Sequence, residues 1–115
     1  MITVYGIKNC DSVKKARNWL QKQGIDYQFN DFRAQGIERE TLQTWIDQVG
    51  IGVIVNKRGT TWRNLEPSQQ QKINEVSNAV DLLMANPTLI KRPVLNVDGI
   101  ITIGFTTDSY QSLFH

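Results

Sequence analysis

The one cysteine of the sequence, Cys10, stands where a thiol can become reactive. It follows a short apolar segment that ends at Gly6, and it directly precedes a segment with helical spacing. The first N–H groups of a helix lack backbone partners and lie at the positive end of the helix dipole, so both favour a thiolate. Such a position can lower a cysteine pKa from about 8.5 to roughly 3.5–7.5. Lys14 and Lys15 add positive charge, although at most one of them faces the thiol because they lie about 100° apart on a helix.

Cys10 has no second cysteine in this chain with which to form a disulfide. If Cys10 carries out redox chemistry, its partner thiol therefore comes from another molecule. His115 is the only histidine and lies at the far end of the sequence. One cysteine and one distant histidine match no usual metal-binding spacing, so we expect no metal and no tightly bound cofactor.

Length and composition indicate an ordinary globular protein. The 115 residues, 40% hydrophobic and 21% charged, fit a single domain, residues 1–115, whose core needs no disulfide or metal. The net charge of +2 is too small to indicate binding to nucleic acid or membranes. The sequence starts without the segments of a signal peptide, and no apolar run approaches the roughly 20 residues of a transmembrane helix. We expect a cytoplasmic monomer with a reduced thiol.

The elements that must position Cys10 form a β-α-β pattern. Residues 2–5 alternate and are rich in β-formers, which predicts a strand. Residues 11–23 place apolar side chains on one helical stripe, and Gly24 is the expected stop. Residues 27–30 predict a second strand. Asp11 or Ser12 is expected to cap the helix, and Cys10 to lie in the loop before it.

The middle of the chain predicts a helical insert at about 37–86. Residues 38–49 and 67–84 have helical spacing, and a loop at 56–59 lies between them. No linker rich in Pro, Gly or Ser flanks this insert, so we expect it to belong to the same domain. Trp62, close to the loop, is expected to be a packing residue, with a place at the rim of a site as the alternative.

The last part of the chain predicts a hairpin and a helix. Asp98-Gly99 between two β-prone runs, residues 93–97 and 100–103, is a strong signal for a tight turn between strands. Thr107 or Asp108 is the expected cap of a final helix. The complete order is then β-α-β, helices, β-hairpin and α.

This order, with a cysteine after the first strand, resembles the thioredoxin fold, an α/β fold that here implies a mixed four-stranded sheet. Three motifs narrow the resemblance. They are Cys10 with Lys14-Lys15-Ala16, then Asn56-Lys57-Arg58-Gly59, then Leu89-Ile90-Lys91-Arg92-Pro93. Together they resemble the arsenate reductase family (ArsC/Spx-like), on its YffB-type branch, and the resemblance covers essentially the whole chain.

The resemblance implies a site around the thiol. The first-loop cysteine of the family is the nucleophile, which corresponds to Cys10. Family arginines that correspond to Arg58 and Arg92 help to hold an oxyanion or a thiolate near the sulfur. A guanidinium suits this role because it forms bidentate hydrogen bonds and keeps its charge when partly buried. For either arginine, the alternative is an ordinary solvated charge.

Three further residues complete the expected site. Pro93 corresponds to a proline that follows a cis peptide bond and presents backbone hydrogen bonds to a peptide-like ligand such as glutathione. Asn9 corresponds to an asparagine that donates to the site from the same loop as the thiol. Lys14 is the lysine expected to face the thiol or its ligand.

Two departures from the family pattern bear on the reaction. Arsenate-reducing members carry a third arginine just after the hairpin, and residues 102–106 contain none. Spx-type regulators often carry a second cysteine three residues after the first, where this chain has Val13. These departures disfavour arsenate as a substrate and exclude an internal disulfide switch.

The sequence therefore predicts a glutathione-dependent thiol reductase that uses Cys10 and is resolved by glutathione or a glutaredoxin. One alternative is an arsenate reductase coupled to glutathione and glutaredoxin. The other is a regulator like Spx, without enzymatic activity, that binds a protein partner.

Overall fold

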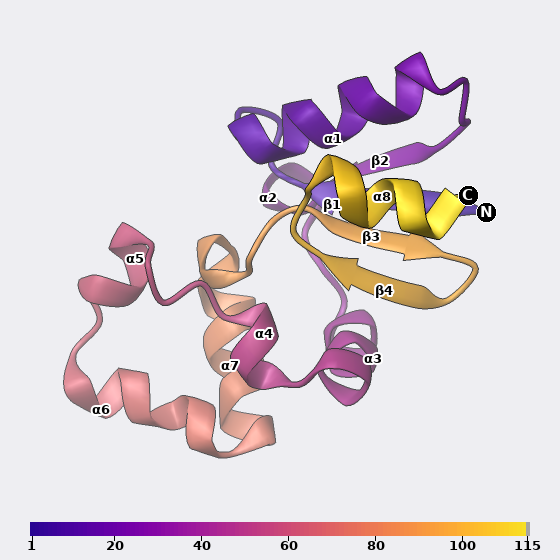
Figure 1. The fold of residues 1–115 in the computed structure, drawn as a ribbon. Coiled ribbons are helices and arrows are strands. Elements are labelled where there is room, and N and C mark those ends of the chain that lie inside the picture. Colours follow the sequence, from indigo (N-terminus) through magenta and orange to yellow (C-terminus); the bar gives the residue numbers. More distant parts are fainter. Residues whose placement is uncertain (115) are drawn as a thin grey trace. The chain divides into compact units, whose positions relative to one another are not determined.

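In the computed structural model, which describes residues 1–114, the chain divides into two compact units (Figure 1). The first unit combines Met1–Gln35 with the C-terminal segment that begins at Arg92, and the second is Gly36–Lys91. The insert expected at 37–86 lies within the second unit. No helix of the described part is long and apolar enough to cross a membrane.

The first unit is built on one four-stranded sheet in the order β2-β1-β3-β4. Strand β1 runs parallel to β2 and antiparallel to β3, and β3 and β4 form an antiparallel hairpin. The predicted thioredoxin-like fold with a mixed four-stranded sheet is therefore confirmed. The elements of this unit are β1 (Ile2–Gly6), α1 (Asp11–Lys22), β2 (Gln28–Asp31), α2 (Phe32–Gln35), β3 (Val94–Val97), β4 (Ile100–Ile103) and α8 (Thr107–Phe114).

One face of this sheet carries the core of the first unit. Val4 of β1 is fully buried and pairs with Phe29 on one side and Leu95 on the other, so the three side chains share a face. Helices α1 and α8 cover that face together. Their buried contributions are Ala16, Trp19 and Leu20 from α1 and Tyr110 from α8.

Helix α1 ends at the predicted glycine. Gly24 has a φ of +69°, a conformation that only glycine adopts readily. Its N–H donates to the carbonyl of Gln21 (3.1 Å), and the N–H of Ile25 donates to that of Leu20 (3.0 Å). This pair of bonds is a Schellman motif, which satisfies the last carbonyls of the helix.

Helix α8 is capped one residue earlier than predicted. The Thr106 hydroxyl accepts a hydrogen bond from the N–H of Ser109 (3.0 Å), and the Ser109 hydroxyl accepts one from the N–H of Thr106 (3.2 Å). The expectation of Thr107 or Asp108 as the cap is therefore wrong. Thr106 caps the helix because its hydroxyl group and that of Ser109, three positions later, can each accept a hydrogen bond from the other residue's N–H.

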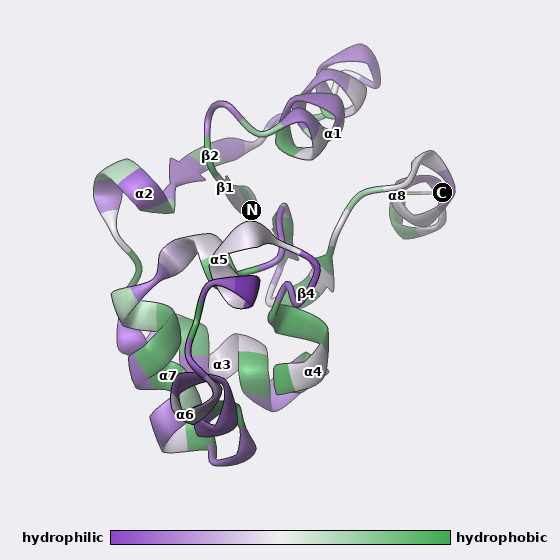
Figure 2. Ribbon diagram, turned by 90° about the vertical axis from the view of Figure 1, so that its left-hand side faces the viewer, coloured by the Kyte–Doolittle hydropathy of each residue, from purple (hydrophilic) through white to green (hydrophobic). Residues whose placement is uncertain are grey.

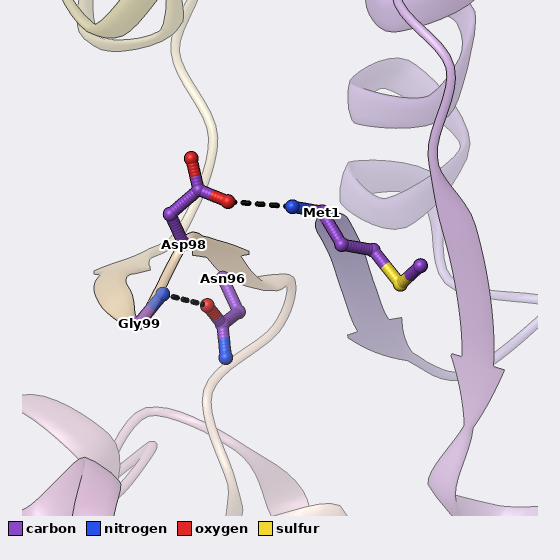
Figure 3. Close-up of polar contacts among 4 residues, drawn as sticks. All are labelled: Met1, Asn96, Asp98 and Gly99. Carbon is purple, nitrogen blue, oxygen red and sulfur yellow. Dashed lines mark hydrogen bonds and ion pairs between the residues drawn. The ribbon is translucent and has the colours of Figure 1, made fainter.

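The Asp98-Gly99 turn joins β3 to β4 as predicted, and it also meets the start of the chain (Figure 3). Both turn residues have positive φ, 51° and 93°, as a tight hairpin loop requires. The Asn96 side chain accepts a hydrogen bond from the N–H of Gly99 (2.7 Å), and Asp98 pairs with the amino group of Met1. The Asn96 bond stabilises the turn itself, and the Met1–Asp98 pair joins the turn to the residue before β1.

The second unit is helical. Its longer helices, α3 and α7, contact each other, and α7 is markedly hydrophobic, whereas α1 of the first unit is largely hydrophilic (Figure 2). An ion pair between Arg39 and Asp81 joins α3 to α7 at the surface. The elements are α3 (Arg39–Val49), α4 (Ile51–Ile54), α5 (Thr60–Arg63), α6 (Pro67–Gln70), the 3-10 turns η1 (Gln71–Asn74) and η2 (Pro87–Leu89), and α7 (Val76–Ala85).

Candidate active site

Cys10 is itself the N-cap of α1. Its backbone is extended (φ −89°, ψ 128°), its N–H donates to the carbonyl of Ile7 (3.1 Å), and its carbonyl accepts from the N–H of Lys14 (3.0 Å). The expectation that Asp11 or Ser12 caps this helix is therefore wrong, because these residues already occupy its first turn. Asp11 and Ser12 were the expected caps because a cysteine is not among the usual capping residues.

The surroundings of Cys10 lower its pKa. Its side chain is partly buried, and burial alone would raise the pKa of the thiol. The N–H of Val13, the guanidinium of Arg92 and the N–H of Ser12 act in the opposite direction and outweigh burial. The site therefore favours the nucleophilic form of the cysteine.

The first turn of α1 is packed tightly against the end of β1. The side chain of Val13 is fully buried and lies over Gly6, where a Cβ atom would be 2.5 Å from its Cγ2 atom. Only a residue without a side chain allows this approach. The contact fixes the position of the Val13 N–H, and so the place where a thiolate is stabilised.

Asp31 holds the loop that carries the thiol. One of its carboxylate oxygens accepts a hydrogen bond from the N–H of Lys8 (3.2 Å). The other accepts from the N–H groups of Arg33 (2.9 Å) and Ala34 (3.2 Å), so Asp31 also caps α2. Asp31 was not among the residues predicted from the sequence, although an aspartate between a strand and a helix is a capping signal.

Sheet order brings Arg92 to Cys10. Tyr5, near the end of β1, pairs with Val94, the first residue of β3. The loop after β1 and the residues before β3 therefore lie at the same end of the sheet. The Arg92 side chain, half-buried, acts on the Cys10 sulfur as a hydrogen-bond donor and as a charge.

Pro93 is buried directly beside this arginine. The Arg92–Pro93 peptide bond is cis, as predicted from the resemblance. The Pro93 carbonyl accepts a hydrogen bond from the N–H of Gly104 (2.8 Å), which ties it to the end of the hairpin. Its expected role in presenting hydrogen bonds to a ligand stays a prediction.

Asn9 and Lys14 lie next to the thiol in sequence, and both are exposed. Neither side chain makes a hydrogen bond or ion pair within residues 1–114. Their roles in ligand binding therefore stay predictions. His115, which was not expected to bind a metal together with Cys10, lies outside the described residues.

Arg58 belongs to the second unit, where two short segments pair. Val55 and Ile90 form an isolated antiparallel bridge. The N–H of Asn56 donates to the carbonyl of Leu89 (2.8 Å), and the N–H of Lys91 donates to that of Ile54 (2.7 Å). This pairing sets the Lys-Arg-Gly loop beside Lys91.

Three cations line one pocket of the second unit, of about 450 Å³. They are Lys57, Arg58 and Lys91, and no acidic side chain lines the same pocket. Such a cavity suits an anion. Lys91 was not predicted from the sequence to be a site residue, although it lies within the Leu89–Pro93 motif. Trp62 does not line this pocket and instead lies under the Lys57 ammonium, 5.6 Å from the ring centre.

Comparison with protein families matches residues 5–113 to the ArsC family. An uncharacterized protein of Haemophilus influenzae is 46% identical over 114 residues, which cover 99% of each chain. The global transcriptional regulator Spx of Streptococcus pyogenes is 26% identical over 97% of this chain and 84% of its own length.

Solved structures show the same fold. A protein named YffB superposes with a TM-score of 0.92 at 40% identity, and 97% of each chain is covered. An arsenate reductase (ArsC) related protein of Brucella melitensis superposes with a TM-score of 0.77 at 41% identity, over 98% of this chain and 93% of its own.

Proposed function

Because this chain belongs to the ArsC family, we propose that it is a glutathione-dependent thiol reductase whose nucleophile is Cys10. The observation that carries the proposal is the lowered pKa of a partly exposed thiol that faces Arg92 and the first turn of α1. Reactive cysteines occupy electropositive, partly exposed surroundings of this kind, whereas structural cysteines are buried and inert. The sequence holds no second cysteine, so a thiol from outside must complete the cycle.

The reaction proceeds by two thiol–disulfide exchanges. The Cys10 thiolate attacks the glutathione sulfur of a mixed disulfide, the disulfide bond breaks, and the substrate leaves as a thiolate that takes up a proton. A second glutathione, as its thiolate, attacks the glutathione sulfur now bound to Cys10. Oxidised glutathione leaves and the Cys10 thiolate is restored. A low pKa helps the second step, because a thiol of low pKa is the better leaving group.

The cationic pocket of the second unit offers a place for carboxylates. Lys57, Arg58 and Lys91 meet there without an acidic neighbour, and glutathione carries carboxylates at both ends. A guanidinium binds a carboxylate through two parallel hydrogen bonds, which gives Arg58 the most directional role of the three. We propose that this pocket binds such an anion.

Mass spectrometry after incubation with oxidised glutathione tests the proposal. We expect one glutathione adduct on the wild-type protein, none on Cys10→Ser, and slower adduct formation in Arg92→Gln. Arg33→Gln is the matched control, because Arg33 is an exposed arginine of the same unit that is not among the groups lowering the Cys10 pKa. A wild-type protein that stays unmodified contradicts the proposal.

Arsenate reduction is the second candidate, favoured by family membership and by the cation beside the thiol. In that reaction Cys10 attacks arsenate, and external thiols supply the electrons. The segment from Thr102 to Thr106 lacks the third arginine of arsenate-reducing members, so one charge on the oxyanion goes uncompensated. A coupled assay with arsenate, glutathione and glutaredoxin separates the two candidates, and we expect activity near background.

A regulatory role without catalysis is the third candidate, favoured by the likeness to Spx. A protein that acts only by binding would not need a reactive thiol. Pull-down from a cell lysate with wild-type protein and Cys10→Ser tests this role. A stoichiometric subunit of RNA polymerase, the enzyme on which a transcriptional regulator acts, captured equally by both proteins would favour this role over the reductase.

A further inference from the structure

We propose that the pocket between α1 and β2 of the first unit binds the zwitterionic head group of an α-amino acid, with Arg17 on the carboxylate and Asp26 on the ammonium group. The pocket measures about 450 Å³ and is also lined by Gln21, Ile25, Tyr27 and Phe29. Its volume falls in the range of small-molecule sites. Neither the thiol nor Arg92 lines it, so the inference does not depend on the function proposed above.

The Arg17 side chain is held in place before any ligand arrives. Its Nε atom donates to the Tyr27 hydroxyl (3.0 Å), and its guanidinium lies 4.1 Å from the centre of the Phe29 ring. A planar guanidinium fixed in this way loses little freedom when it binds a carboxylate. Arg17 makes no ion pair within residues 1–114, so its terminal N–H groups lack a counter-charge.

Asp26 supplies the opposite charge in the same pocket. It is exposed, and its carboxylate makes no ion pair or hydrogen bond in the described part of the chain. Arg17 and Asp26 therefore line one cavity without neutralising each other. A ligand that carries both a carboxylate and an ammonium group would give each residue a partner of opposite charge.

Other ligand classes fit the pocket less well. A simple anion would meet the negative charge of Asp26, and a simple cation would meet the positive charge of Arg17. An apolar ligand would cover both charged groups without giving either a partner. A purely structural Arg17 that shields the Phe29 ring explains the stacking, but it predicts no effect of added amino acids.

Titration followed by NMR of the uniformly ¹⁵N-labelled protein tests the site. The probes are L-leucine, L-glutamine and L-phenylalanine, which contain no thiol and cannot react with Cys10. We expect at least one of them to shift the backbone amides of residues 24–27 with a Kd of about 1 mM or below. N-acetyl and carboxamide forms of that amino acid lack one charge each and should bind at least about tenfold more weakly, a loss of 1.4 kcal/mol.

Three variants decide which residues are responsible. Asp26→Asn and Arg17→Gln should each weaken the response at least about tenfold, whereas Lys22→Gln, which removes a charge from the same helix outside the pocket, should leave it unchanged. Asp26→Asn breaks no hydrogen bond or ion pair among residues 1–114, so its result stands even if Arg17→Gln fails to fold. The proposal is overturned if no probe shifts these amides, if the N-acetyl form binds as well as the free amino acid, or if Asp26→Asn binds normally.

Discussion

The Arg92 guanidinium acts on the Cys10 sulfur both as a hydrogen-bond donor and as a neighbouring positive charge. Removing that charge in Arg92→Gln should raise the pKa of the thiol and slow its alkylation by iodoacetamide at pH 7 several-fold. The alkylation rate of Arg92→Lys should lie between those of the wild-type protein and Arg92→Gln, because an ammonium keeps the charge but not the planar donor geometry. Stopped-flow alkylation measures all three proteins. Equal rates in wild type and Arg92→Gln would show that Arg92 does not activate the thiol.

Gly6 should resist substitution because Val13 lies against it. In Gly6→Ala the new methyl group would be 2.5 Å from Val13 Cγ2, so the first turn of α1 must shift. We expect a loss of about 1–3 kcal/mol in the free energy of unfolding, as overpacking of a buried contact commonly costs. The shift also moves the Val13 N–H, so the Cys10 pKa should rise. Urea denaturation and alkylation at several pH values measure the two effects.

Gly52→Ala is the matched control for that substitution. A Cβ atom at Gly52 meets nothing within 4 Å, and the residue lies within α4 without a positive φ. The same chemical change should therefore be neutral, or should stabilise the chain by about 0.4–1 kcal/mol. If both variants lose stability equally, the Gly6–Val13 contact is not the cause.

Cys10 should make stability depend on pH. Its pKa is lower in the folded chain than in the unfolded one, so between these two values the unfolded chain binds more protons. The free energy of unfolding therefore rises with pH across this window and levels off above the unfolded pKa of about 8.5. On acidification the same contribution is lost, and it is gone once the pH lies below the folded pKa. Urea denaturation under reducing conditions should show this rise in wild type relative to Cys10→Ser. Parallel profiles for the two proteins would contradict it.

Tyr110 should respond in the opposite sense at alkaline pH. Burial raises its pKa well above the usual range, so stability is lost as the pH rises past the unfolded tyrosine pKa of about 10. Its hydroxyl is buried and has no hydrogen-bond partner in the described residues. Tyr110→Phe should therefore reduce the alkaline loss and, at neutral pH, leave stability unchanged or raise it by about 1 kcal/mol. A loss of more than about 1 kcal/mol at neutral pH would mean that the hydroxyl is bonded in solution.

Features with local signals were predicted well. The hairpin follows from Asp98-Gly99, because these residue types adopt the positive φ that a tight turn requires, and the β-α-β order follows from periodicity in residues 2–30. The end of α1 follows from Gly24. In each case the residues that carry the signal lie within a few positions of the feature.

Features that depend on tertiary contacts were not predicted from pattern alone. The approach of Arg92 to Cys10 requires β3 to lie beside β1, and only the resemblance to a family anticipated it. The Gly6–Val13 contact depends on how α1 packs, which no spacing in the sequence reveals. Thr106 and Asp31 are different, because both carried recognisable capping signals that were assigned to neighbours or overlooked.

The pH dependence of Cys10 alkylation in the wild-type protein is the most direct test of whether Cys10 is an activated nucleophile. We expect a single titration with a pKa below that of an unperturbed cysteine, about 8.5, because the N–H of Val13, Arg92 and the N–H of Ser12 together outweigh burial. A pKa at or above that of the unperturbed thiol would contradict it, because burial would then dominate and Cys10 would not be an activated nucleophile.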